Sequence, residues 1–512
     1  MKHPHMPEFR NSSSVLLSLM LALLLSCKNN DTLLPDDAEI AGATIEPAVT
    51  ASKAPEGNTG TGINPNDRIE TRTFSRKVTI HYGPVVSITQ PENGAGIEFT
   101  VSGGNVAIRS TAGEVEYELS GTTAAGSLKI TSDKAFKVTL NNVNITNPVG
   151  SALNLQSDST AFVIMMPGTT NTLADGNAYD KTEDGKGTLF SEGPLVLNGT
   201  GALAVKSLGK HAIVSDDYVY VAGASITVSE ALKDGIHAND AVVIDGGTLK
   251  ITATDDGIQC EKGHIIINDG SISISSTGKA ITASYDTDTK IDPYLTLNGG
   301  HIKIQSKDEG IESKSVLTVN GGTIEIESTD DAINAGTFLY INGGNIFARS
   351  SGNDGIDSNG PLTVTGGTVV AVGAANPEAG VDCDRSTFKI TGGIVVGIGG
   401  STSVPTASVS TQRSVVLGGG AAGQLLSILS DKGAEALTFL APAAYQTLLF
   451  SSPKLEGNLT YQVYTGGSVS GADAFGGLYL SGSYEPGNRS PATFTTTAMV
   501  TTAGGNTGPG GR

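Results

Sequence analysis

The sequence predicts an all-β protein: a single-stranded, right-handed parallel β-helix of about 22–23 residues per coil, with a small antiparallel β-cap at its C-terminal end. Three observations predict this fold. Glycine is abundant, with 67 Gly among 512 residues, whereas Trp is absent and aromatic residues make up 5%. A Gly-centred turn recurs through the middle of the chain. Apolar and polar residues alternate on both sides of that turn, which is typical of strands with one buried face.

Charge and cysteine content exclude several classes of protein. The chain has 51 acidic and 32 basic residues, so its formal net charge is −19. A protein that follows nucleic-acid phosphates needs a basic face, and we therefore expect no nucleic-acid partner. Three cysteines are too few for a disulfide scaffold. We expect a monomer.

The N-terminal residues are typical of a bacterial lipoprotein. An apolar run, Val15–Leu25, is too short to span a bilayer comfortably and ends just before Cys27. We predict a signal peptide over residues 1–26, cleavage before Cys27 and lipid attachment to that residue. The protein would then be an outer-membrane lipoprotein, at the cell surface or on the periplasmic face. Residues 27–75, rich in Pro, Asn, Asp and Gly, predict a lipid anchor followed by a flexible tether.

A repeat of about 23 residues organises residues 76–400. One coil of this length cannot bury its apolar face alone, but stacked coils can, each about 4.8 Å above the last. Strand crossovers are usually right-handed, which gives the expected hand of the helix. The second small residue of the recurring turn falls at Gly201, Ala224, Gly247, Gly270, Gly300, Gly322, Gly344, Gly367 and Gly393.

The chain changes character after the last coil. Residues 401–503 carry larger apolar side chains and more tyrosine, which predicts an antiparallel β-cap. Residues 504–512, GGNTGPGGR, predict a disordered tail.

Acidic residues recur at the turn before the third strand of each coil. Stacking would place their carboxylates about 5 Å apart, and each like-charge pair would cost about 1 kcal/mol in water or about 3–4 kcal/mol at a dielectric constant of 20. Calcium accepts six to eight oxygen ligands and would remove this repulsion. The alternative is ordinary turn chemistry on a solvated edge. The predicted metal ligands are Asp255, Asp256, Asp308, Glu309, Asp330, Asp331, Asn353, Asp354, Asp357 and Asp382.

One coil departs from the acidic pattern, because Lys279 occupies the column between Asp256 and Glu309. We expect its ammonium group to substitute for a bound cation there. Two cysteines, Cys260 and Cys383, share another column, five coils apart. That separation of about 24 Å excludes a disulfide, so we predict two free, buried thiols.

Four stretches together resemble a known family: Leu140–Leu155, Met166–Gly201, the repeated NGG…DDGI coils and Leu448–Gly487. The chain resembles the calcium-binding, right-handed β-helix carbohydrate-binding proteins first described from cellulose-degrading clostridia. The resemblance implies calcium at the Asp turns and binding of an acidic polysaccharide such as polygalacturonate, or of cellulose. The fold of that family also resembles that of pectate lyases. Lys210, His211 and Lys279 depart from the family's Asp-Asp pattern.

Three functions fit these patterns. The first is a non-catalytic polysaccharide binder at the cell surface, and it is the interpretation we favour. The second is a calcium-dependent pectate or uronate lyase, for which Lys233 and Lys314 are the candidate bases. The third is a structural, adhesin-like surface rod that calcium only stiffens. The tyrosines that could stack on sugar rings are Tyr179, Tyr218, Tyr220, Tyr285 and Tyr340.

Overall fold

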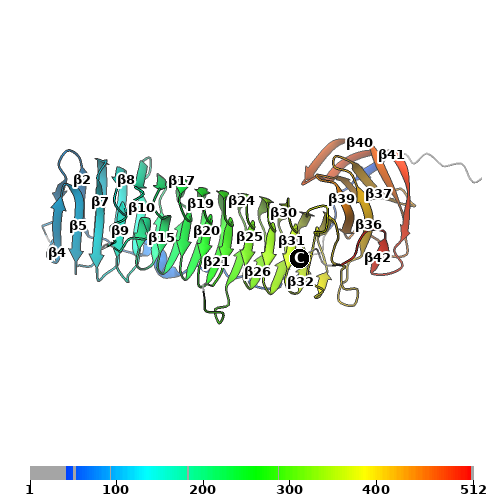
Figure 1. Ribbon diagram of the computed structural model, residues 1–512, viewed down its shortest axis with the longest axis horizontal. Helices are drawn as coiled ribbons and strands as arrows, with labels where there is room; N and C mark the ends of the chain where they lie inside the picture. Colours follow the sequence, from blue (N-terminus) through cyan, green and yellow to red (C-terminus); the bar gives the residue numbers. More distant parts are fainter. Residues whose placement is uncertain (1–41, 50–52, 93, 182–183, 286, 509–512) are drawn as a thin grey trace, which may run out of the picture. The chain divides into compact units, whose positions relative to one another are not determined.

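The computed structural model describes residues 42–49, 53–92, 94–181, 184–285 and 287–508. These residues form a parallel β-solenoid followed by an antiparallel sheet (Figure 1), as the sequence predicts. Within them there is no α-helix, only the short 3-10 turns Pro65–Asp67 and Ile69–Thr71. The same residues contain no helix with the length and apolarity needed to cross a membrane. The predicted signal peptide and Cys27 lie outside the described residues.

Each regular coil has three strands, and the third strands form the most uniform face. Their inward isoleucines stack in register from Ile236 to Ile356 and are almost fully buried. Burial of such a side chain contributes about 1.5–3 kcal/mol, so the column is a main source of stability. The third face contains β5 (Gly104–Ser110), β7 (Gly126–Ser132), β9 (Leu153–Gln156), β12 (Gly187–Ser191), β15 (His211–Ser215), β18 (Ile236–Ala238), β20 (Ile258–Cys260), β22 (Ile281–Ala283), β25 (Ile311–Ser313), β28 (Ile333–Ala335) and β31 (Ile356–Ser358).

The first and second faces meet at the Gly-centred turn. Gly322 has a φ of +94°, and a Cβ atom there would lie 2.8 Å from the carbonyl oxygen of Gly300 in the coil below. The turn therefore requires glycine on both conformational and steric grounds. The first face contains β2 (Arg76–Tyr82), β10 (Ala161–Met165), β13 (Leu195–Asn198), β16 (Tyr218–Ala222), β23 (Tyr294–Leu297), β26 (Val316–Val319), β29 (Phe338–Ile341), β32 (Leu362–Val364) and β34 (Phe388–Ile390).

The second face shows the alternation that the sequence predicts. In the strand His301–Ser306, Ile302 and Ile304 point inward while the residues between them are exposed. This face contains β11 (Thr170–Asp175), β14 (Ala202–Ser207), β17 (Ser225–Ala231), β24 (His301–Ser306), β27 (Thr323–Ser328), β30 (Asn345–Ser350), β33 (Thr368–Val372) and β35 (Ile394–Gly399). Four longer strands continue from the first face to the second: β6 (Val115–Thr123), β8 (Phe136–Asn147), β19 (Ala241–Ala253) and β21 (His264–Ser276).

Antiparallel strands close both ends of the solenoid. At the first coil, β3 (Ser87–Thr89) pairs with β2, and β4 (Ile97–Ser102) pairs with β5. At the last coil, β39 (Tyr445–Ser451) pairs antiparallel with β35. An unpaired strand edge would be a template for aggregation, and these pairings cover the edges. Beyond β39, β36 (Ser414–Gly420) also pairs with β39, and β42 (Val500–Ala503) pairs with β36.

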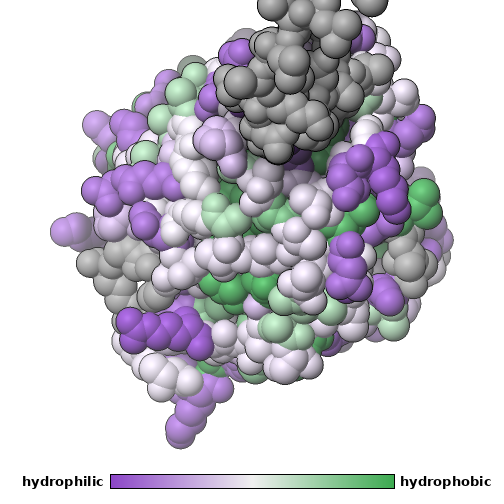
Figure 2. All heavy atoms as spheres, turned by 90° about the vertical axis from the view of Figure 1, so that its right-hand side faces the viewer, coloured by the Kyte–Doolittle hydropathy of each residue, from purple (hydrophilic) through white to green (hydrophobic). Residues whose placement is uncertain are grey.

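The C-terminal cap is a five-stranded sheet in the order β1-β41-β38-β37-β40. Figure 2 shows the face at this end, where weakly polar and apolar side chains occupy the centre and hydrophilic ones lie mainly at the periphery. Residues 504–508, predicted to be disordered, are instead placed on the cap, because Asn506 donates to Gly400 O at 3.0 Å. The strands are β1 (Ala43–Ile45), β37 (Leu425–Ser430), β38 (Glu435–Leu440), β40 (Thr460–Phe475) and β41 (Leu478–Thr495).

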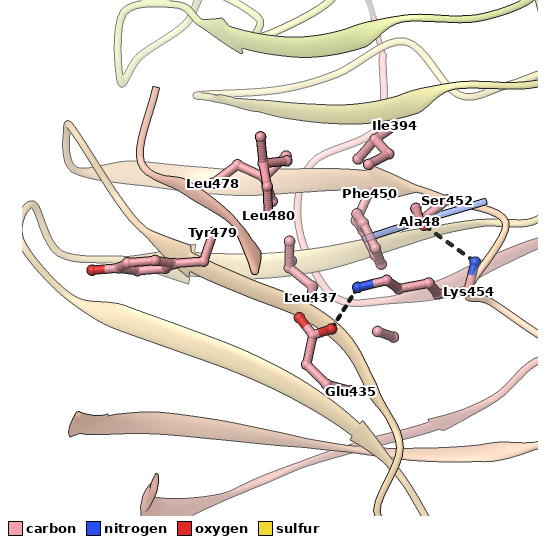
Figure 3. Close-up of a pocket in the computed structure, with 11 residues that line it drawn as sticks. Ala48, Ile394, Glu435, Leu437, Phe450, Ser452, Lys454, Leu478, Tyr479 and Leu480 are labelled. Atoms are coloured by element: carbon pink, nitrogen blue, oxygen red, sulfur yellow. Dashed lines mark hydrogen bonds and ion pairs between the residues drawn. The ribbon is translucent and has the colours of Figure 1, made fainter. Parts of the chain in front are cut away.

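A buried ion pair lies inside the cap (Figure 3). The Lys454 ammonium contacts the Glu435 carboxylate at 2.6 Å, and the Glu435 side chain is 1% exposed. Burial raises the pKa of Glu435, and the neighbouring ammonium group opposes that rise. The enclosed space beside the pair measures about 10 Å³, which is no larger than a single water requires. The pair is therefore part of the packed core of the cap.

The sequence predicts a flexible tether over residues 27–75. This prediction is wrong for those residues of the range that the structure describes. After β1 pairs with β41 in the cap, residues 53–75 lie along the first face of the solenoid, and we call this segment the N-terminal strap. Asparagines at four successive turns form a ladder. The side-chain amide of each one donates to a side-chain amide or carboxylate oxygen in the preceding coil and to a backbone carbonyl of the strap. They are Asn268, Asn298, Asn320 and Asn342, and their acceptors in the strap are Thr61, Gly60, Asn58 and Glu56.

Apolar contacts hold the other end of the strap. Ile63, Ile69 and Phe74 pack against outward-facing residues of the early coils, among them Phe162. The Phe74 and Phe162 rings meet edge to face with centroids 5.8 Å apart. The strap is thus an ordered part of the fold from one end of the solenoid to the other.

The two cysteines confirm the predicted register. Cys260 pairs in register with Ala283, and the same column continues through four further coils to Cys383. Both thiols are free and buried, and burial raises their pKa values to about 12 and about 11.

We predict that Asn320→Ala releases the strap. The substitution removes the bonds from Asn320 Nδ2 to Asn58 O and Asn298 Oδ1, and we expect a loss of about 1–3 kcal/mol of stability. Hydrogen exchange measured by mass spectrometry should show faster exchange in peptides covering residues 53–62. The matched control is Asn359→Ala, at an exposed turn on another edge. Equal exchange in the two variants would contradict the prediction.

We predict that Lys454→Met destabilises the cap by about 3 kcal/mol, because it leaves the buried Glu435 carboxylate without its cation. The double variant Glu435→Gln, Lys454→Met should recover part of the loss, since no charge then remains to be desolvated. Thermal melting followed by circular dichroism measures both effects. A double variant less stable than Lys454→Met alone would argue against this account.

Candidate functional site

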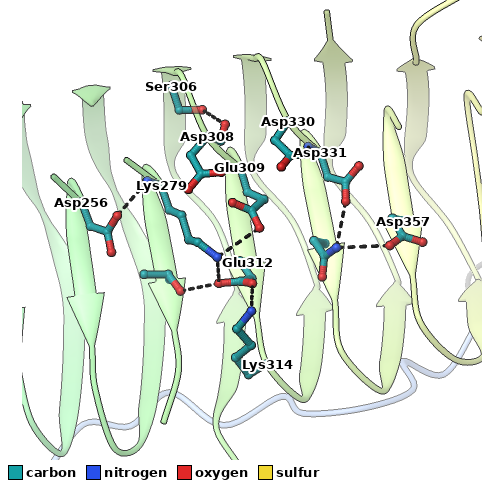
Figure 4. Close-up of polar contacts among 12 residues, drawn as sticks. Asp256, Lys279, Ser306, Asp308, Glu309, Glu312, Lys314, Asp330, Asp331 and Asp357 are labelled. Carbon is teal, nitrogen blue, oxygen red and sulfur yellow. Dashed lines mark hydrogen bonds and ion pairs between the residues drawn. The ribbon is translucent and has the colours of Figure 1, made fainter. Parts of the chain in front are cut away.

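The candidate site lies where the second strand of each coil turns into the third. We call this row of turns, from Asp234 to Asp382, the acidic edge (Figure 4). A serine at the end of each second strand stabilises the turn: Ser306 Oγ donates to Asp308 O at 3.0 Å, and Ser328 Oγ donates to Asp330 O at 2.7 Å. Because the third strands are in register, equivalent turn residues of neighbouring coils lie next to one another.

Lys279 divides the acidic edge, as the sequence predicts. Its ammonium donates to Glu309 Oε1 at 3.0 Å and to Glu312 Oε2 at 2.6 Å. Although burial lowers the pKa of Lys279, these two carboxylates raise it above its usual range. The Asp256 carboxylate accepts the Lys279 backbone N–H at 2.7 Å. A fixed positive charge therefore neutralises one coil of the column.

Eight of the ten predicted ligands fall into three carboxylate clusters. Within each cluster, oxygens from three side chains lie within 4.8 Å of one another. Two oxygens on one calcium ion, bound at 2.3–2.6 Å, are at most about 5 Å apart, so the spacing fits calcium. The clusters are Asp234, Asp255 and Asp256; Asp308, Glu309 and Asp330; and Asp354, Asp357 and Asp382.

Repulsion and burial are visible in the pKa values of these groups. Burial, with the neighbouring carboxylates Asp331, Asp357 and Asp382, raises the pKa of Asp354 to about 9. Burial and the Asp308 carboxyl raise the pKa of Glu309 to about 7. The charged forms of Asp354 and Glu309 are thus disfavoured in these surroundings.

One atom supports the fit of a cation directly. Glu309 Oε2 is buried, and no donor in the described part of the chain forms a hydrogen bond to it. A buried carboxylate oxygen without a donor is costly, and a cation held with Asp308 and Asp330 would satisfy it. These residues would provide oxygen ligands only, the type that calcium prefers.

Two predicted ligands are placed outside the clusters. Asp331 accepts the Asp354 backbone N–H at 3.0 Å and the Asn334 side-chain amide at 2.9 Å. Asn353 donates its side-chain amide to Asp330. Both residues therefore hold the edge together through hydrogen bonds between coils.

Two adjoining grooves lie beside the acidic edge. One, of about 410 Å³, is lined by Lys307, Asp308, Asp330 and Glu378 among others. The other, of about 370 Å³, lies on the second face of the same coils and includes Arg349. Glu378 was not predicted, because it lies in an insertion that breaks the repeat.

The two candidate lyase bases have different surroundings. Lys314 forms an ion pair with the buried Glu312 carboxylate, and Lys233 is exposed next to Asp234. Among the candidate stacking residues, Tyr218 donates to Asp67 of the strap at 2.7 Å. An added Cβ at Gly57 of the strap would lie 2.6 Å from the Tyr340 ring, so the strap also covers that tyrosine.

A further cluster was missed by the sequence analysis. His211, Asp234 and His237 bring two ring nitrogens and a carboxylate oxygen within 4.8 Å of one another. In the sequence, His211 and Asp234 occupy the same column as the predicted ligands. This shared position is the feature that could have identified the cluster. In the sequence, His211 stands out only as a departure from the Asp-Asp pattern.

Comparisons with known proteins bear on the solenoid. No curated protein matches the chain. A solved structure, described as the polysaccharide lyase-like protein from C. thermocellum, gadolinium derivative, is 24% identical and covers 46% of this chain and 96% of its own, with a TM-score of 0.37. Residues 102–355 match the model of a family described as carbohydrate-binding domain-containing protein.

Proposed function

We propose that this protein is a non-catalytic, calcium-loaded binder of acidic polysaccharide, of the polygalacturonate type, anchored at the bacterial cell surface through Cys27. The observation that carries the proposal is the cluster of Asp308, Glu309 and Asp330 beside a groove, within the segment that matches the carbohydrate-binding family.

Charge explains why a cation is needed. The chain has a net charge of −19, so an anionic polysaccharide would be repelled by the bare protein. Calcium bound by side-chain carboxylates keeps coordination positions for further oxygens, including those of a uronate. Lys307 and Arg349 line the grooves beside the clusters and add positive charge where the sugar chain would lie.

The strap supports this location for the ligand. It covers the outer side of the first face from the coil of Asn342 to that of Phe162. Two grooves lie along the second face and the acidic edge, where the outward residues Gln305, Glu327 and Arg349 follow one another across three strands. We therefore place the polysaccharide along the acidic edge and second face, crossing several coils.

We predict that calcium and polygalacturonate binding are coupled at this edge. Calorimetry should show calcium binding that Asp330→Asn weakens by about tenfold, because the cluster loses one charged ligand. Polygalacturonate should bind only with calcium present, and no unsaturated uronide should form. Asp240→Asn, which removes one exposed carboxylate at a different turn, is the matched control.

Three results would contradict the proposal. Release of unsaturated product would identify a lyase and make Lys233 and Lys314 the next residues to replace. Calcium binding without any glycan binding would leave a structural rod. Glycan binding that persists in a chelator would exclude the calcium bridge.

We predict that Cys27→Ser abolishes lipid attachment. In cells fed a labelled fatty acid, the natural chain should incorporate label and fractionate with the outer membrane, whereas the variant should not. Cys260→Ser is the control, because its buried thiol is not at the predicted cleavage point. Label retained in Cys27→Ser would refute the anchor.

A further inference from the structure

Two histidines and an aspartate meet at the early end of the acidic edge. His211 begins β15, Asp234 lies in the turn before β18, and His237 is in the middle of β18. These strands are neighbours, with Val214 paired to His237. The two imidazole rings lie side by side, with centroids 4.4 Å apart and planes inclined by 36°.

Both rings direct the same nitrogen at one oxygen. His211 Nδ1 lies 3.1 Å from Asp234 Oδ2, and His237 Nδ1 lies 2.8 Å from the same atom. Ligands bound tetrahedrally to a zinc-like ion at 2.0–2.1 Å lie about 3.3 Å apart. Only a small outward movement would separate the three atoms to that distance.

The hydrogen-bonding roles at these nitrogens conflict. The Asp234 backbone N–H points at His211 Nδ1 at 3.4 Å, which requires a lone pair there, while Asp234 Oδ2 on its other side requires a proton. His237 Nδ1 faces two acceptors, Asp234 Oδ2 and Gln259 Oε1 at 2.9 Å. A cation among these atoms would accept all the lone pairs at once.

The surroundings match those of a metal-binding histidine. The second nitrogen of His237, Nε2, lies 3.6 Å from the Glu261 carboxylate. Ligating histidines usually have such an outer partner, which orients the ring. Asp234 Oδ1 accepts the Asp256 backbone N–H at 3.1 Å, which holds the carboxylate in place.

Burial also suits a bound ion. The Asp234 side chain is 2% exposed, and those of His211 and His237 are 14% and 12% exposed. The carboxylate is thus withdrawn from water, while the rings leave a path from the solvent.

The ligand types separate this cluster from the calcium clusters. Imidazole nitrogens select zinc, cobalt, nickel or copper, whereas carboxylates alone select calcium. The carboxylate cluster of Asp234, Asp255 and Asp256 shares Asp234 with the histidines, whereas the other two carboxylate clusters lie beyond Lys279. We propose that His211, Asp234 and His237 form a transition-metal site of the zinc type, with a fourth position open to water or a sugar oxygen.

Cobalt(II) is the probe, because its visible spectrum reports nitrogen and oxygen ligands in a tetrahedral or five-coordinate site. The mature chain, freed of metal with a chelator, should bind one equivalent with an intense visible band. Zinc should displace the cobalt, and millimolar calcium should not. His237→Ala should weaken cobalt binding at least tenfold. His301→Ala, at an exposed histidine of the second face, should leave it unchanged.

Folding defects are distinguished by a second pair of variants. His211→Asn keeps a polar side chain of similar reach and should also lose the cobalt band while its circular dichroism and melting curve stay those of the natural chain. Asp354→Asn should weaken calcium binding and keep the cobalt band, so that failure of one site is separable from failure of the other. The absence of a cobalt band in the natural chain, its persistence in both histidine variants, or its displacement by calcium would each overturn the proposal.

Discussion

The stacking of coils in register at strand spacing, about 4.8 Å, is the constraint on which the rest of this structure depends. It places each residue next to its equivalent in the coils above and below. For isoleucine this is favourable, and the column from Ile236 to Ile356 is buried throughout. For asparagine it is also favourable, since each side-chain amide donates to the oxygen of the coil before it. For carboxylates the same geometry is repulsive.

Two parts of the acidic edge differ in whether the chain itself offsets that repulsion. In one coil the chain provides its own cation, because Lys279 lies between Glu309 and Glu312. In the coils that follow, the carboxylates face one another, and burial and mutual repulsion raise the pKa of Asp354 to about 9. The fold thus holds this row of acids together at a cost in free energy. The repeated geometry of the turn fixes the spacing of these groups, and the side chains decide which charges meet there.

The strap makes the first face of the solenoid different from the other two faces. Its backbone carbonyls accept from the asparagine ladder, and its apolar residues cover Phe162 and its neighbours. The first face is consequently covered by the strap over part of its length. Tyrosines that could have formed a sugar platform, such as Tyr218, are used for contacts with the strap. Two grooves lie on the polar second face and the acidic edge, and a third, of about 330 Å³, lies between the strap and the first face near Tyr220.

The sequence by itself determined the coil, its three strands, the register and the antiparallel cap, because these follow from periodicities within about 23 residues. The positions of Cys260 and Cys383 and the pairing of Lys279 follow from the same register. Only the tertiary structure decided the course of the strap, whose Glu56 meets Asn342 across 286 residues of sequence. The approach of Glu378, which lies in an insertion, to the acidic edge was likewise decided in three dimensions. Contacts between a segment that does not repeat and one that does leave no periodic signal, so no spacing in the chain could predict them.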